Sequence, residues 1–186
     1  MPPVLLSDND LRARLDPIDT DWGEPELRDA AVIAPLFTRD GRDWLLYTRR
    51  NRDLGVHAGE MSFPGGQREP GENALQCALR EMHEEIGLPA RGVDVLGRLP
   101  RRQSRHHSVH PFVGRVAPPR DLVLDPTEVD AVVEIPIAEL RVESRWEWRD
   151  VKGRGRVYRL PFFEHGEDTL WGLTAVVTLD LLARLG

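Results

Sequence analysis

Short apolar runs separated by polar turns predict a series of β-strands through the middle of the chain. The runs cover residues 30–37, 44–48, 93–96, 109–116 and 131–135. The Asp40-Gly41 pair between the first two runs predicts a hairpin. Pro35 predicts that the first strand lies at an edge or a bulge, because proline has no N–H to give to a neighbouring strand. The polar segment 49–62 is interpreted as a loop.

Helices are predicted in four places, at residues 7–15, 73–86, 136–140 and 171–185. Ser7 can cap the first, and Gly87 is suited to end the second, which has the clearest helical pattern in the chain. Trp146 and Trp148 alternate with polar neighbours, which is typical of one face of a strand. Strands and helices follow one another without regular βαβ repeats, so the sequence favours the α+β class.

The helix over 73–86 carries an apolar stripe on one side. At about 100° per residue, this stripe contains Leu75, Ala78, Leu79, Met82 and Ile86. Glu81, Glu84 and Glu85 fall on the other side, which we expect to be exposed. Each like-charged pair at this spacing destabilises a helix by about 0.2–0.5 kcal/mol. A divalent cation that prefers oxygen ligands, Mg²⁺ or Mn²⁺, would offset the repulsion; the alternative is a solvated acidic face.

The residues around this acidic face follow a defined pattern. The segment GGQREPGENALQCALREMHEEIGL, residues 65–88, fits Gx5Ex7REUxEExGU, in which U is a bulky aliphatic residue. The matching positions are Gly66, Glu72, Arg80, Glu81, Glu84, Glu85 and Gly87, with Met82 and Leu88 at the U positions. The segment resembles the Nudix box of the Nudix hydrolases. The resemblance implies a mixed β-sheet sandwiched between α-helices, and hydrolysis of a nucleoside diphosphate linked to another moiety.

The resemblance also implies a metal site. Glu81, Glu84 and Glu85 would bind Mg²⁺ or Mn²⁺, and the carbonyl oxygen of Gly66 would add a ligand. A diphosphate and a glutamate cluster repel one another, so a cation between them is required for binding and for charge stabilisation during the reaction.

Arg80 and Glu72 would form an ion pair that braces the helix, again by resemblance. Eight residues of straight helix span about 12 Å, so Glu72 should lie on the preceding loop and fold back. A carboxylate must also accept a proton from the attacking water. Glu84, Glu128 and Glu164 are the candidates for this base, and the sequence does not choose among them.

The segment before the box, residues 46–66, resembles the upstream signature of the coenzyme A pyrophosphatase branch, LLTxR[SA]x3Rx3Gx3FPGG. The matching positions are Leu46, Thr48, Arg50, Gly59, Phe63, Pro64, Gly65 and Gly66. Tyr47 and Asn51 depart from it, and Gly55 stands where the signature has a second arginine. The resemblance implies cleavage of coenzyme A to 3′,5′-ADP and 4′-phosphopantetheine, with Arg50 as a candidate for binding the substrate. NADH, ADP-ribose and a non-catalytic binding module are the alternatives.

Composition narrows the possible partners. The chain has 31 acidic and 25 basic residues and a formal net charge of −6, which disfavours a surface that coats nucleic acid. Cys77 is the single cysteine, so no intrachain disulfide can form. No apolar run approaches the ~18 residues of a membrane span, and the N-terminus lacks the features of a signal peptide. We therefore expect a cytoplasmic protein that binds a small nucleotide, without nucleic-acid or membrane partners.

The length of 186 residues suits one domain over 1–186, of which 1–29 form an N-terminal extension with a helix. The sequence does not distinguish a monomer from a homodimer.

Overall fold

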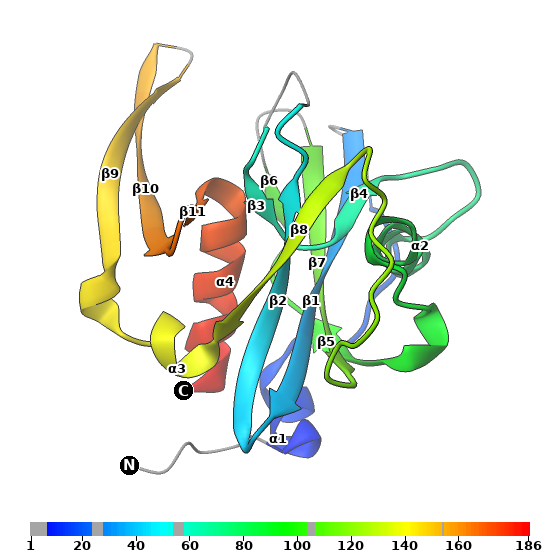
Figure 1. Cartoon of the computed structure of the whole chain (residues 1–186). Coiled ribbons are helices and arrows are strands. Elements are labelled where there is room, and N and C mark those ends of the chain that lie inside the picture. Colours follow the sequence, from blue (N-terminus) through cyan, green and yellow to red (C-terminus); the bar gives the residue numbers. More distant parts are fainter. Residues whose placement is uncertain (1–6, 24–27, 54–57, 104–106, 154) are drawn as a thin grey trace.

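A mixed β-sheet forms the centre of the computed structural model, which describes residues 7–23, 28–53, 58–103, 107–153 and 155–186 (Figure 1). Its strands are β1 (Arg28–Arg39), β2 (Arg42–Arg50), β3 (Met61–Ser62), β4 (Gly65–Gln67), β5 (Val93–Arg98), β6 (Arg102–Gln103), β7 (His107–Val116) and β8 (Val129–Pro136). The main order is β3-β2-β1-β7-β5, while β4 pairs with β1, β6 with β7 and β8 with β2. β1 and β7 are parallel, and the other pairs are antiparallel.

Helices cover both faces of this sheet. α2 (Ala74–Ile86) packs on one face, and α3 (Ile137–Leu140) and α4 (Gly172–Leu185) pack on the other. Alternate residues of β2 enter the two cores, because Leu45 and Tyr47 belong to the cluster around α4 while Leu46 belongs to the cluster around α2. A strand buried on both faces needs apolar residues at every position, which explains the continuous apolar runs. The predicted α+β fold, a mixed sheet between helices, is confirmed.

The predicted helix ends are also confirmed. Asn73 caps α2 in a capping box with Gln76, and Gly87 ends the helix with a φ of 75°, in the left-handed region that glycine adopts at low cost. Ser7 caps α1 (Asp8–Arg14). Two short 3₁₀ turns, η1 (Ala90–Gly92) and η2 (Glu143–Arg145), complete the helical elements of the described residues.

The expected edge position of the strand around Pro35 is wrong. β1 lies in the interior of the sheet, with β7 along one side. On the other side, β4 pairs with residues 30–32 and β2 pairs with residues 36–39, so Pro35 lies in the gap between these two partners. The Ile33 N–H donates to Pro64 on that same side. Because alternate residues point to the same side, the missing N–H of Pro35 falls where no partner strand requires it.

A second sheet was largely missed by the sequence analysis. Its strands are β9 (Trp146–Gly153), β10 (Arg156–His165) and β11 (Asp168–Trp171), in the order β11-β10-β9. At its base, the rings of Trp146 and Phe163 lie 5.1 Å apart in the core. Beyond this contact β9 and β10 extend past α4, and Trp148 is 53% exposed (Figure 1). Strands that expose both faces need no alternation of apolar and polar residues, so β10 left no clear pattern in the sequence.

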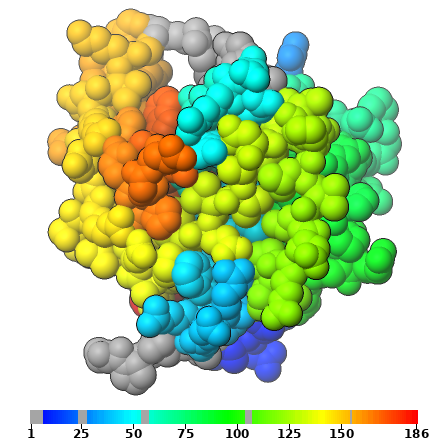
Figure 2. All heavy atoms as spheres, in the orientation of Figure 1, coloured from blue at the N-terminus to red at the C-terminus, as the bar shows by residue number. Residues whose placement is uncertain are grey.

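The segment 49–62 contains more structure than the predicted loop, because β2 continues to Arg50 and β3 follows. Arg49 joins both sheets there, through Asp130 at 2.6 Å and Asp168 at 3.1 Å. Figure 2 shows the three segments concerned, in cyan, yellow-green and orange, packed together on one face. Among the helices of the described residues, none is both long enough and apolar enough to cross a membrane.

Candidate metal centre

Three carboxylates meet beside α2. Glu81, Glu85 and Glu128 each present an oxygen atom, and these atoms all lie within 4.8 Å of one another. Glu81 and Glu85 are one turn apart on the helix, and Glu128 comes from the segment before β8. Sequence reasoning considered Glu128 only as a base, because its distance along the chain from the box hid this proximity. A cluster of carboxylate oxygens is the donor set that Mg²⁺ and Mn²⁺ prefer.

The expectation that Glu85 is exposed is wrong. Its exposed fraction is 3%, because neighbouring backbone segments cover this part of α2. The Gly65 N–H donates to the carboxylate at 3.3 Å, and the Asp125 N–H donates to the main-chain carbonyl of Glu85 at 3.0 Å. Burial is the main cause that raises the pKa of Glu85 to about 8, and the nearby charges of Glu81 and Glu128 contribute to this rise. Burial also raises the pKa of Glu81. A cation would offset these unfavourable charges, so the cluster fits a divalent metal.

Gly66 leaves room for the carboxylate of Glu81 beside the sheet. It lies opposite Ala31 in the ladder between β4 and β1. A Cβ atom at this position would lie 2.4 Å from the carboxylate carbon of Glu81, so any side chain would displace Glu81. The carbonyl of Gly66 accepts a weak hydrogen bond from Cys77 Sγ at 3.5 Å, and its role as a metal ligand stays a prediction. Burial raises the pKa of Cys77 to about 12, which leaves the thiol protonated and unsuited to act as a nucleophile.

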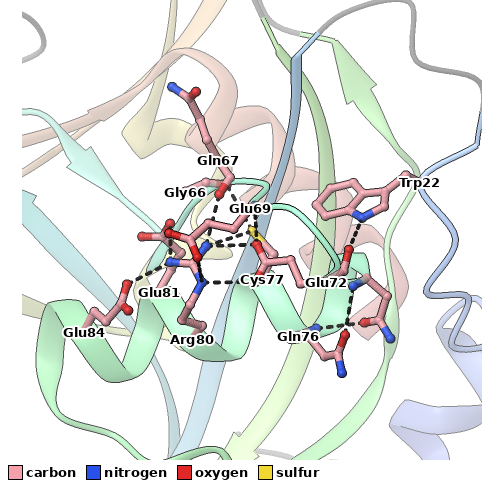
Figure 3. A network of polar contacts seen from close by, with 11 residues as sticks. Trp22, Gly66, Gln67, Glu69, Glu72, Gln76, Cys77, Arg80, Glu81 and Glu84 are labelled. Carbon is pink, nitrogen blue, oxygen red and sulfur yellow. Dashed lines mark hydrogen bonds and ion pairs between the residues drawn. The ribbon is translucent and has the colours of Figure 1, made fainter.

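Arg80 connects the loop before α2 to the acidic residues (Figure 3). It donates to both carboxylate oxygens of Glu72, at 3.0 and 2.9 Å, in the bidentate arrangement that arginine favours. It also donates to Glu81 at 3.0 Å and to Glu84 at 2.8 Å. The predicted ion pair is therefore present, with Glu72 on the loop just before the N-cap. Hydrogen bonds from Arg80 lower the pKa of Glu72.

The other two candidate bases lie in different surroundings. Glu84 lies outside the group of three carboxylates, with 56% of its side chain exposed and its carboxylate on Arg80. Glu164 belongs to β10 of the second sheet. Its carboxylate accepts hydrogen bonds from Arg149 at 3.0 Å and Thr169 at 2.6 Å, and it does not belong to the group of three carboxylates.

Hydrogen bonds from Asn51 hold the turn that places Glu128 beside Glu81 and Glu85. The side chain of Asp125 accepts hydrogen bonds from the N–H and hydroxyl of Thr127, a local arrangement typical of tight turns. Asn51 then donates from its amide side chain to the Pro126 carbonyl at 2.6 Å, and from its N–H to the Glu128 carbonyl at 2.8 Å. Asn51, which departs from the upstream signature, therefore fixes the segment that carries Glu128.

Arg50 ends β2 next to this turn. Its Nε atom is buried and has no hydrogen-bond partner among the residues that the structure describes. Its positive charge offsets a small part of the rise in the pKa of Glu85. Arg49, in contrast, is committed to Asp130 and Asp168. Gly55, the departure from the signature that removes a second arginine, lies outside the described residues.

Comparison with known proteins agrees with this geometry. A family model described as a NUDIX domain matches residues 27–159. The chain belongs to the Nudix hydrolase family. An uncharacterized Nudix hydrolase, NudL, of Photorhabdus laumondii is 35% identical over 186 residues, which cover 99% of this chain and 90% of the relative. Nudix hydrolase 3 of Caenorhabditis elegans is 33% identical over 206 residues, which cover 98% and 78%.

Solved Nudix structures show the same fold at lower identity. A binary complex of the Caenorhabditis elegans Ap4A hydrolase superposes with a TM-score of 0.52 at 19% identity, over 60% of this chain and 82% of that one. A MutT/nudix family protein from Enterococcus faecalis also gives 0.52, at 13% identity, over 80% and 52%. The Nudix family and the residues of the box make this chain a hydrolase of a diphosphate substrate.

The buried carboxylates of this Nudix hydrolase give its stability a pH dependence. The pKa of Glu85 rises from 4.5 to about 8 on folding, so the folded chain binds an extra proton between these values and loses stability as the pH rises through them. In EDTA, we expect the melting temperature to fall more between pH 6 and pH 8.5 than in Glu85→Gln. In the wild type, the gain in melting temperature from Mn²⁺ should be larger at pH 8.5 than at pH 6. An equal decline of the melting temperature in the wild type and in Glu85→Gln would contradict the raised pKa of Glu85.

Proposed function

We propose that this Nudix hydrolase cleaves the diphosphate bridge of coenzyme A or its acyl derivatives. The products would be 3′,5′-ADP and 4′-phosphopantetheine or its acyl form. The proposal is supported by the resemblance of residues 46–66 to the signature of the coenzyme A pyrophosphatase branch. Phe63 of that segment is buried and stacks on Tyr47 with ring centres 4.7 Å apart, which anchors the FPGG turn beside the box.

The observation that carries the proposal is that the buried Nε of Arg50 has no hydrogen-bond partner among the described residues. Its guanidinium lies close enough to the carboxylate cluster to influence Glu85, yet its side chain forms no ion pair within the described ranges. A buried donor without a partner is costly. A phosphate oxygen would satisfy it, and guanidinium is well suited to phosphate. We assign Arg50 to a phosphate of the substrate, with the 3′-phosphate of coenzyme A as the group to be tested.

The residues of the site divide the chemistry among them. Glu81, Glu85 and Glu128 would hold Mg²⁺ or Mn²⁺, which when bound neutralises the diphosphate and makes a bound water more acidic. The water oxygen attacks one phosphorus, and the bond from that phosphorus to the bridging oxygen breaks, leaving this oxygen on the second phosphate. We assign Glu84 as the general base that accepts the proton of this water, because its carboxylate lies on the same helix but outside the group of three carboxylates. Arg80 and Glu72 keep Glu81 in place.

Of the two alternatives, one has specific support in the sequence and the other does not. The glycine at position 55 removes an arginine from the coenzyme A signature, which favours another nucleotide such as NADH or ADP-ribose. A non-catalytic binding module would have no need for three carboxylates that repel one another, so the cluster itself supports an enzyme.

A substrate panel tests the proposal. We expect the protein with Mg²⁺ or Mn²⁺ to convert coenzyme A into 3′,5′-ADP and 4′-phosphopantetheine, identified by mass. Acyl-coenzyme A, NADH and ADP-ribose are tested in parallel at equal concentration. Cleavage of NADH or ADP-ribose while coenzyme A survives would reject the coenzyme A assignment, and no cleavage of any would favour the binding module.

Replacing Arg50 tests its role in recognising phosphate. Arg50→Ala should raise the KM for coenzyme A about 10- to 100-fold, because a hydrogen bond to a charged group contributes about 1.5–3 kcal/mol. The KM for dephospho-coenzyme A should change much less, since that compound lacks the 3′-phosphate. Arg52→Ala is the matched control, because Arg52 is exposed and pairs with Glu167 at 3.6 Å. Equal losses on both substrates would exclude a contact with the 3′-phosphate.

A further inference from the structure

The segment 16–23 lies before the region that the family model matches, yet it contacts the Nudix box. Asp16 forms a β-bridge with Arg98 at the end of β5, which fixes the start of the segment. The Thr20 carbonyl then accepts the N–H of Ala74, the first residue of α2, at 3.0 Å. This N–H is one of those that a helix N-terminus leaves without an internal partner.

Trp22 makes the closest contact with the box. Its ring is buried, with 4% exposed, and its indole Nε1–H donates to the main-chain carbonyl of Glu72 at 2.8 Å (Figure 3). His110 meets the ring edge-on at 5.2 Å between ring centres. The Arg68 guanidinium lies 5.2 Å from the ring centre on the loop that also carries Glu72. The ring is therefore held on several sides, so the direction of its N–H is fixed.

Glu72 occupies the middle of a chain of contacts. Its carbonyl is held by Trp22, and its carboxylate accepts two hydrogen bonds from Arg80. Arg80 in turn donates to Glu81, a member of the three-carboxylate cluster. Glu72 lies in the loop between β4 and α2, so neither a strand nor a helix fixes its backbone. Its main-chain carbonyl needs another support, and Trp22 supplies it.

We propose that Trp22 is a positioning residue for the metal site: through the Glu72 carbonyl it aligns the Glu72–Arg80 pair and thereby the carboxylate of Glu81. This inference rests on the metal-binding role of Glu81, Glu85 and Glu128 proposed above. It extends the functional unit to a tryptophan outside both the box and the matched domain. The N–H is the group that acts, because the ring alone would supply only packing.

Trp22→Phe tests the role of the N–H, since phenylalanine keeps an aromatic ring and removes the donor. Trp44→Phe is the control: Trp44 is half-buried and stacked on Phe37, and its Nε1 has no hydrogen-bond partner in the described part of the chain. Mn²⁺ binding is measured by electron paramagnetic resonance at a temperature where all variants are folded. We expect about threefold to tenfold weaker binding in Trp22→Phe, the factor that one hydrogen bond provides, and no change in Trp44→Phe.

A double variant separates positioning from general destabilisation. In a Glu72→Gln background, Trp22→Phe should weaken Mn²⁺ binding by less than twofold, because both changes act on the same chain of contacts. Fully additive effects of Trp22→Phe and Glu72→Gln on Mn²⁺ affinity would overturn the proposed role of Trp22 and leave the metal site untouched. Equal Mn²⁺ affinity in Trp22→Phe and wild type would do the same. Failure of the wild type to bind Mn²⁺ would overturn the metal site of the proposed function as well, so the two failures are distinguishable.

Discussion

Glu85→Gln should lower the turnover of the diphosphate substrate at least about 100-fold while leaving the metal-free fold intact or more stable. The amide keeps the shape of the carboxylate and removes the charge that binds the cation. In EDTA at pH 8 the variant is relieved of a buried charge whose pKa is raised to about 8, so its melting temperature should rise. The gain in melting temperature from Mn²⁺ should largely disappear. Turnover and calorimetry on the same preparations measure these effects.

Glu84→Gln is the matched control on the same helix. Its carboxylate lies outside the cluster and is largely exposed, so the stabilisation by Mn²⁺ should persist. Turnover should still fall about 100-fold, as expected for loss of a general base. Full activity in Glu85→Gln would remove this residue from the metal site, and loss of Mn²⁺ stabilisation in Glu84→Gln would move Glu84 into it.

Glu128→Gln should produce the second large effect, about a 10- to 100-fold weaker Mn²⁺ affinity with a matching loss of turnover at low metal concentration. The reason is that Glu128 brings the third carboxylate to Glu81 and Glu85. Raising the Mn²⁺ concentration should restore much of the turnover, because two ligands remain. Titration of activity against metal concentration measures both the affinity and the maximum rate.

Glu164→Gln serves as the control for this variant. Glu164 also lies outside the box, but its carboxylate contacts Arg149 and Thr169 of the second sheet, so Mn²⁺ affinity and turnover should stay unchanged. If Glu128→Gln instead keeps its Mn²⁺ affinity and loses turnover at every metal concentration, Glu128 is the base and not the ligand. That outcome would also predict near-normal turnover in Glu84→Gln.

The local elements could be predicted because their determinants lie close together in the chain. Asn73 and Gly87 mark the ends of α2, and the apolar spacing between them defines its buried face. The Arg80–Glu72 pair was implied by the resemblance to the Nudix box, and it forms because Glu72 lies directly before the N-cap of α2 and two helical turns before Arg80. β10 could not be predicted, because its outer half is exposed on both faces and carries no periodic signal.

The burial of Glu85 shows where periodicity is insufficient. Helical spacing places Glu85 with Glu81 and Glu84 and says nothing about what covers each of them. The Gly65 N–H and the segment around Asp125 cover Glu85 and leave Glu84 in solvent. Two neighbouring glutamates thereby acquire different environments, and only one belongs to the cluster.

The sequence by itself determined the fold class, the acidic helix and the family, because strand runs, helix caps and the box are all encoded within short stretches of chain. The tertiary structure decided which carboxylates meet. Glu128 meets Glu81 and Glu85 because Asn51, which lies far from Glu128 in the sequence, holds the turn that carries it. Trp22 contacts Glu72 from outside the matched domain. Such contacts depend on how distant segments pack, and the free energy of that packing is a property of the whole fold that no local pattern records.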